Sequence, residues 1–231
     1  IAVVEEAYND NMFMLTPSGS AVDCIRYDNA FRVCFSDPNQ GIASADYIAS
    51  QKLGTKIAVI YNSSDPYSSG IYEKFMAEAA VKGLNVVAQG AFTADTKTDF
   101  TVQLQQAKTA GADLLFLPIY YQEASLILAQ ADKMGYDPAV FGVDGMDGIL
   151  TLENFDTKLA EDVMLLTPFA ADAQDKLTQD FVNSYKAKYN EVPNQFAADA
   201  YDGIYIIKAA IEKAGATPDM STEELCNALK G

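Results

Sequence analysis

The chain has 231 residues, with 32 acidic and 16 basic side chains, a formal charge of −16 and no histidine. An excess of negative charge repels phosphate backbones and anionic lipid headgroups, so we expect no binding to nucleic acid. Because 49% of the residues are apolar, the chain can bury a core. No apolar run reaches the ~18 residues that a membrane-spanning helix needs.

The first predicted elements are two short apolar strands, Met12–Leu15 and Ala30–Phe35. Between them lies the loop Thr16–Ser20, which carries three hydroxyl groups and Gly19. The hydroxyls can donate hydrogen bonds, and a glycine lets backbone N–H groups approach an anion such as a carboxylate. A turn that only caps a following short helix is the alternative at this point.

The middle of the chain alternates short apolar strands with amphipathic helices. The predicted strands are Lys56–Tyr61, Asn85–Ala88, Asp113–Pro118 and Ala139–Val143. The predicted helices cover residues 67–82, a segment that opens at Asp95–Thr98 and stops before Gly111, and residues 122–134. This spacing is typical of βαβ units and predicts an α/β fold with a doubly wound parallel sheet and right-handed crossovers.

After Asp144 the pattern changes to one strand, Val163–Thr167, and three helices near 173–189, 194–214 and 221–230. Three helices cannot complete a sheet, so we expect them to return to the sheet that begins at Met12. The predicted organisation is a first lobe of residues 1–37, a second lobe of residues 38–165, and a return to the first lobe over residues 166–231. Two lobes with two crossings predict a hinge and a cleft.

Three polar side chains follow predicted strands of the second lobe: Tyr67, Tyr120 and Asp144. Ligands of open α/β sheets bind at the carboxyl ends of strands. Singly, the tyrosines could be packing residues and Asp144 a turn residue before Gly145. Together, an anion-binding hydroxyl loop and an ammonium-binding carboxylate predict a zwitterionic ligand, an α-amino acid.

Enzyme and metal functions find no support in the sequence. It has no histidine for a catalytic triad, no G-x-S-x-G elbow and no P-loop, so we expect no catalytic residue and no cofactor. Cys24, Cys34 and Cys226 form no C-x-x-C pair, and Asp144–Gly148 lacks the ligand set of a calcium loop, so no metal site is expected. Cys24 and Cys34 could form a disulfide or remain two buried thiols, and their spacing leaves both open.

Four segments, taken in order, resemble one family. They are Met14–Ser20, Phe31–Val33 with Asp37–Gly41, Lys56–Tyr61 with Tyr67, and Val143–Gly145. The resemblance is to the type I periplasmic substrate-binding proteins of ABC transporters, in the leucine/isoleucine/valine-binding branch. It implies the two-lobe type I periplasmic-binding fold, with doubly wound parallel sheets joined by a hinge. It also implies that the N-terminal part of the first lobe and the C-terminal end are missing from this chain.

The resemblance also assigns residues to the ligand. Ser18, Gly19 and Ser20 match the loop that holds the carboxylate, and Tyr67 and Tyr120 match pocket tyrosines of the second lobe. Asp144 takes the place of an acid, usually glutamate, that binds the α-amino group, and Phe196 matches an apolar contact to the ligand side chain.

The function implied by the resemblance is extracytoplasmic solute capture. We expect a monomer, in the periplasm or anchored as a lipoprotein on a Gram-positive cell, that closes around an amino acid and delivers it to an ABC transporter permease. The alternative is a ligand-sensing domain of a receptor or regulator that binds amino acids, amides or other small polar solutes.

Overall fold

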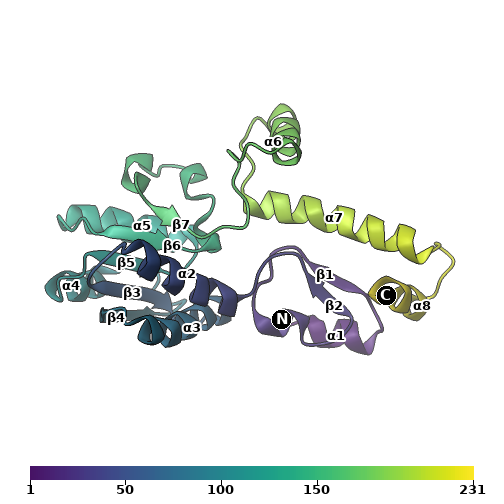
Figure 1. Cartoon of the computed structure of the whole chain (residues 1–231), viewed down its shortest axis with the longest axis horizontal. Coiled ribbons are helices and arrows are strands. Elements are labelled where there is room, and N and C mark those ends of the chain that lie inside the picture. Colours follow the sequence, from purple (N-terminus) through teal and green to yellow (C-terminus); the bar gives the residue numbers. More distant parts are fainter. The chain divides into compact units, whose positions relative to one another are not determined.

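The computed structural model describes residues 1–231, which form two compact units. Unit 1 comprises Ile1–Ser36 and Pro168–Gly231, and unit 2 is the continuous segment Asp37–Thr167. Each unit has parallel strands and helices of its own (Figure 1). The α/β architecture with parallel pairing is as the sequence predicts.

Unit 2 is built on a five-stranded parallel sheet with the strand order β4-β3-β5-β6-β7. Its strands are β3 (Ile57–Asn62), β4 (Val86–Phe92), β5 (Leu114–Leu117), β6 (Ala139–Gly142) and β7 (Met164–Leu165). Its helices are α2 (Asp37–Gln51), α3 (Pro66–Lys82), α4 (Thr101–Thr109) and α5 (Tyr121–Lys133), with 3-10 turns η2 (Asp144–Met146), η3 (Ile149–Thr151) and η4 (Thr157–Ala160). Because β3, β5 and β6 are neighbours in the strand order and run parallel, their carboxyl ends lie side by side.

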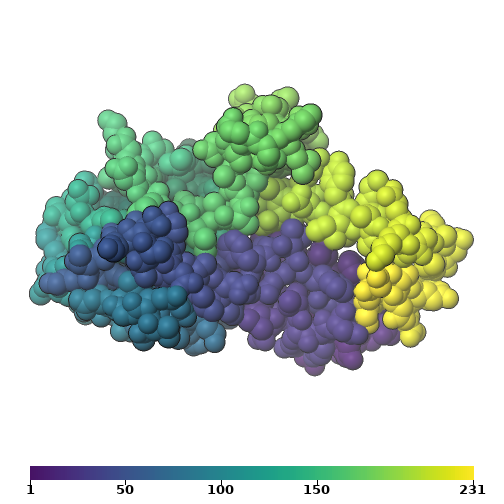
Figure 2. Space-filling model, in the orientation of Figure 1, coloured from purple at the N-terminus to yellow at the C-terminus, as the bar shows by residue number.

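Helices cover both faces of this sheet and form a core on each. Successive side chains of β3 point to opposite faces and so belong to the two cores in turn. Ile57 and Val59 pack with residues of α2 and α3, whereas Ala58 and Ile60 pack with residues of α4 and α5. All four side chains are at most 1% exposed. In the space-filling view, α2 and α3 form much of the surface of unit 2 that faces the viewer (Figure 2).

The helix predicted to open at Asp95–Thr98 begins later, at Thr101, so this prediction was wrong. Gln130 of α5 holds the preceding loop through both ends of its amide, because Oε1 accepts from the Phe100 N–H (2.7 Å) and Nε2 donates to the Thr98 carbonyl (3.0 Å). These bonds span about thirty residues and fix the loop in a non-helical course. A local pattern of capping residues carries no information about them.

Asp113 fastens the amino ends of β3 and β5 together, at the end of the sheet away from the tyrosines. Its Oδ1 accepts from the backbone N–H groups of Thr55 (2.9 Å) and Lys56 (2.8 Å), and its Oδ2 accepts from the Thr55 hydroxyl. Desolvation by the neighbouring protein works to raise the pKa of the exposed Asp113, but the bonds from Thr55 and Lys56 outweigh it and lower the pKa below its ordinary value.

We expect Asp113→Asn to destabilise unit 2 by about 1 kcal/mol at pH 7, since the amide replaces one acceptor oxygen by a donor and water screens the exposed carboxylate. A pKa that is lower in the folded state stabilises the fold above the unfolded value of about 4, and this contribution disappears as the pH falls through the folded value. Urea unfolding at pH 7 and pH 3 should therefore show a difference between wild type and variant that shrinks on acidification. A difference of equal size at both pH values would contradict the assignment.

Unit 1 contains the parallel pair β1 (Met14–Thr16) and β2 (Ala30–Arg32), in which Met14 lies opposite Ala30. Its helices are α1 (Val4–Asn9), the 3-10 turn η1 (Val22–Ile25), α6 (Lys176–Tyr189), α7 (Gln195–Ala214) and α8 (Thr222–Lys230). A Cβ on Gly203 of α7 would lie 3.6 Å from the Leu15 side chain, so α7 packs directly on β1.

Two further features of the chain bear on the sequence predictions. The structure has all three cysteines buried as thiols. None of the helices combines the length and the hydropathy that crossing a bilayer requires.

Candidate functional site

Unit 2 brings together three of the predicted side chains at the carboxyl ends of neighbouring strands. Tyr67 lies in the first turn of α3 after β3, Tyr120 precedes α5 after β5, and Asp144 begins η2 after β6. The rings of Tyr67 and Tyr120 stack, with centroids 4.7 Å apart and planes inclined by 20°. The Tyr67 hydroxyl donates a hydrogen bond to Asp144 Oδ1.

The first turn of α3 is held rigidly, which fixes the position of Tyr67. Asp65 caps the helix by accepting from the Tyr67 N–H at 3.1 Å, and Pro66 occupies the first helical position. The Ser68 hydroxyl accepts from the Asn62 N–H (2.8 Å) and donates to the Pro118 carbonyl (2.5 Å). Because Asn62 ends β3 and Pro118 follows β5, these bonds tie the helix to both strand ends.

Gly145 completes the contact between Tyr67 and the Asp144 turn. Its N–H donates to the Tyr67 hydroxyl oxygen at 2.9 Å. A Cβ at this position would lie 2.6 Å from that oxygen and 3.0 Å from the Ile119 carbonyl oxygen, so a side chain would push the phenol away. The Asp-Gly pair is therefore both a turn and a structural requirement of the site.

Electrostatics keep both tyrosines neutral and able to donate hydrogen bonds. Burial raises the pKa of Tyr67 well above its ordinary value, and the charge and hydrogen bond of Asp144 raise it further. Burial likewise raises the pKa of Tyr120, and the nearby carboxylates of Asp65 and Asp144 add to the effect. A buried carboxylate beside two neutral phenols offers acceptors and aromatic faces that suit a cationic group.

Sequence reasoning missed Gln40, which lies in the first turn of α2 and is fully buried. Its Oε1 accepts from the backbone N–H of Asp144 at 3.3 Å. The two residues are 104 positions apart. Gln40 lies in the segment Asp37–Gly41 that carries the family resemblance, but no local pattern links it to Asp144.

In unit 1, the loop Thr16–Ser20 is closed on itself. The Gly19 N–H donates to Thr16 Oγ1 at 3.0 Å, so this backbone donor already has a partner within the loop. Ser20 is buried and Ser18 is partly buried. Arg32, which was not among the predicted site residues, donates from Nη1 to the Ser20 carbonyl at 2.7 Å and places a positive charge beside the loop.

Phe196 lies in the first turn of α7, also in unit 1, and is partly buried. Asn194 caps this helix by accepting from the Ala197 N–H at 3.1 Å, which fixes the turn that carries the ring. The aromatic side chain provides apolar surface and no hydrogen-bonding group.

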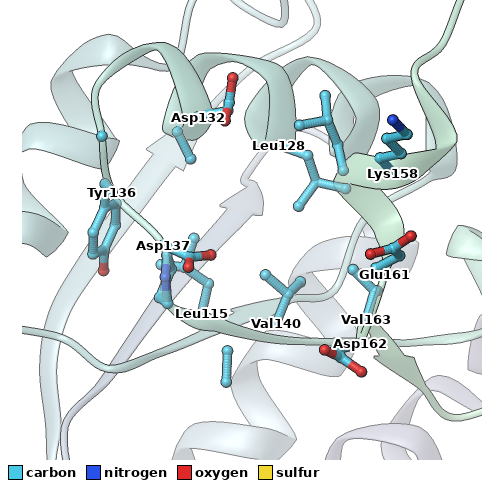
Figure 3. A pocket seen from close by; sticks show the side chains of 15 residues that line it. Leu115, Leu128, Asp132, Tyr136, Asp137, Val140, Lys158, Glu161, Asp162 and Val163 are labelled. Atoms are coloured by element: carbon cyan, nitrogen blue, oxygen red, sulfur yellow. The ribbon is translucent and has the colours of Figure 1, made fainter.

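A cavity of about 580 Å³ lies at the opposite end of β6 from Asp144. It contains none of the predicted site residues. Figure 3 shows the apolar side chains of Leu115 and Val140 in its lining, together with the carboxylates of Asp137, Glu161 and Asp162. Since the loops at the carboxyl ends of the strands are the usual ligand positions in parallel sheets, the cluster of Tyr67, Tyr120 and Asp144 is the better candidate.

Comparison with known proteins gives a family match over the whole chain. A family model described as "Periplasmic binding protein" matches residues 1–231. The chain is 29% identical over 219 residues to "Leu/Ile/Val-binding protein homolog 3" of Brucella melitensis, covering 94% of this chain and 58% of the relative. It is 28% identical over 221 residues to the "Leucine-, isoleucine-, valine-, threonine-, and alanine-binding protein" of Pseudomonas aeruginosa, covering 94% of this chain and 58% of that protein.

Solved structures show the same similarity. The leucine-binding protein LivK of Thermotoga maritima superimposes with a TM-score of 0.83 at 25% identity, covering 99% of this chain and 64% of that one. The branched-chain amino acid transporter substrate-binding protein LivJ of Streptococcus pneumoniae, in complex with isoleucine, gives the same values. The chain thus spans about three fifths of the length of these relatives.

Proposed function

Since the chain belongs to the periplasmic binding protein family, we propose that it captures a branched-chain or similar amino acid outside the cytoplasm and delivers it to the permease of an ABC transporter. The names of the curated relatives and the isoleucine complex of a structural neighbour support this class of ligand. The role is binding without chemical conversion. Because the relatives are longer than this chain, the proposal concerns the whole protein.

The observation that carries the proposal is the buried carboxylate of Asp144, which is 2% exposed and hydrogen-bonded by Tyr67. An α-ammonium group is the part of an amino acid that such a carboxylate recognises, since hydrogen bonds between charged groups are about twice as strong as neutral ones. The stacked rings of Tyr67 and Tyr120 add aromatic faces that attract a cation.

The carboxylate of an amino acid is recognised by hydrogen-bond donors and positive charge, and unit 1 contains residues of both kinds. We assign the loop of Ser18, Gly19 and Ser20 to the ligand carboxylate through its hydroxyl groups, since the Gly19 N–H is bonded to Thr16 Oγ1. The positive charge of Arg32 lies next to this loop. We assign Phe196 to the apolar side chain of the ligand. With Asp144 assigned to the ligand ammonium, each charged group of a zwitterion has a proposed partner in this chain.

The fold alone does not define the ligand. A solute-binding protein of Rhodopseudomonas palustris in complex with benzoate superimposes with a TM-score of 0.83 at 18% identity, covering 99% of this chain and 62% of that one. Benzoate carries no ammonium group, and a buried carboxylate such as Asp144 would repel its anion. The residues of this chain therefore favour an amino acid over an aromatic acid.

A thermal-shift series on the purified protein tests the proposal. We expect L-leucine, L-isoleucine or L-valine at 100 times its dissociation constant to stabilise the fold by about 2.7 kcal/mol, which raises the melting temperature by about 5–10 °C. Two matched probes should give much smaller shifts: 4-methylpentanoate, which lacks the amino group of leucine, and 3-methylbutylamine, which lacks its carboxylate. Benzoate should also give a much smaller shift. No shift with any of the twenty amino acids would refute the proposal.

A further inference from the structure

Gln40 meets the Asp144 turn from a distant part of unit 2. It lies in the first turn of α2, is 0% exposed, and its Oε1 is 3.3 Å from the backbone nitrogen of Asp144. This bond is to the main chain, so through it Gln40 acts on where the turn lies.

The Asp144 N–H needs this partner because of where it lies in the chain. Asp144 is the first residue of η2, and the first N–H groups of a helix have no acceptor within the helix. Val143, which precedes η2, provides no side-chain capping bond. In a residue that is 2% exposed, an unsatisfied N–H is costly. Gln40 therefore supplies the cap that the local sequence lacks.

We propose that Gln40 is a positioning residue for ligand binding, which holds the backbone of Asp144 so that its carboxylate stays against Tyr67 and faces the ligand ammonium. The inference rests on the proposed function of Asp144. Different elements restrain different parts of this residue: Gln40 of α2 holds the backbone nitrogen, and Tyr67 of α3 holds the carboxylate. Removal of the Gln40 bond leaves the charge of Asp144 in place but lets the direction of its carboxylate vary.

The test is Gln40→Met, which keeps the length of the side chain and removes the acceptor. We expect calorimetry to show about tenfold weaker binding of L-leucine. Ser44→Ala is the matched control, because Ser44 lies one turn further along α2, is also 0% exposed, and its hydroxyl has no hydrogen-bond partner. This control should bind L-leucine as the wild type does. Equal affinities of Gln40→Met and wild type would overturn the inference.

A double-mutant cycle separates positioning from a general loss of structure. In an Asp144→Asn background, Gln40→Met should change the L-leucine affinity less than twofold, since residues that act as one unit are not additive. A tenfold loss in both backgrounds would show that Gln40 acts independently of Asp144 and would overturn the inference. If Gln40→Met does not fold, Gln40→Asn serves in its place, because it shortens the side chain by one methylene and withdraws the oxygen.

A measurement without ligand distinguishes failure of this inference from failure of the proposed function. Amide hydrogen exchange followed by NMR should show a protected Asp144 N–H in the wild type and in Ser44→Ala, and at least tenfold faster exchange in Gln40→Met. Unchanged exchange would overturn the positioning role even where L-leucine binds. Faster exchange in a protein that binds no amino acid would leave the contact established and refute the ligand assignment.

Discussion

The variant Asp144→Asn is expected to bind L-leucine about 100-fold more weakly than the wild type. Asparagine has the shape of aspartate and keeps an oxygen that can accept the Tyr67 hydroxyl, so the turn should persist. What is lost is the negative charge that we propose to pair with the ligand ammonium. Truncation of one partner in a buried, hydrogen-bonded charge pair costs about 2–5 kcal/mol, and a 100-fold change corresponds to about 2.7 kcal/mol. Isothermal titration calorimetry measures the change directly.

The control for this variant is Asp137→Asn, which makes the same substitution at the opposite end of β6, in the lining of the cavity in Figure 3. Asp137 is exposed, so its replacement should leave both the fold and the L-leucine affinity unchanged. Binding of L-leucine by a folded Asp144→Asn protein within threefold of the wild type would remove Asp144 from the site. A similar loss in both variants would point to the net charge of the protein instead of a specific contact.

The family and the fold class predicted from the sequence are confirmed, and the reason lies in the strands. A strand buried on both faces, such as β5, must be apolar throughout, so Leu114–Leu117 is visible as a short continuous run. Once the strands are located, parallel pairing places their carboxyl ends at one edge. The proximity of Tyr67, Tyr120 and Asp144 follows from that rule, without any knowledge of side-chain contacts.

What the sequence could not provide are the polar contacts between distant segments. Gln40 bonds to a residue 104 positions away, and Gln130 holds a loop about thirty positions before it. Such contacts depend on how helices lie over a sheet, and a single glutamine fits equally well on a solvent-exposed face. The orientation of two adjacent tyrosines is easier to predict, because adjacent residues point in different directions. Tyr120 stacks on Tyr67, whereas Tyr121 packs against the core under α5.

A second large effect is expected from Gly41→Ala, which should destabilise unit 2 by about 3 kcal/mol. Gly41 lies where α2 meets α3, and an added Cβ would be 2.5 Å from the Ile71 carbonyl oxygen and 2.8 Å from the Phe75 nitrogen. Both atoms belong to the helix backbone and cannot turn aside, so α2 must move away from α3. The gain of about 1 kcal/mol that alanine brings to a helix interior offsets only part of this cost. Thermal unfolding should show a melting temperature about 5–10 °C lower.

Gly70→Ala is the matched control, since Gly70 lies on the facing helix and has room. A Cβ there would be 3.5 Å from the nearest atom, the Asp37 Cβ, which is an ordinary contact. The same substitution should therefore leave stability unchanged or raise it by up to about 1 kcal/mol. Equal stability of the two variants would show that α2 and α3 can separate without cost. Because Gln40 precedes Gly41 on α2 and bonds to the Asp144 backbone, a displaced α2 should also weaken L-leucine binding, and Gly70→Ala should not.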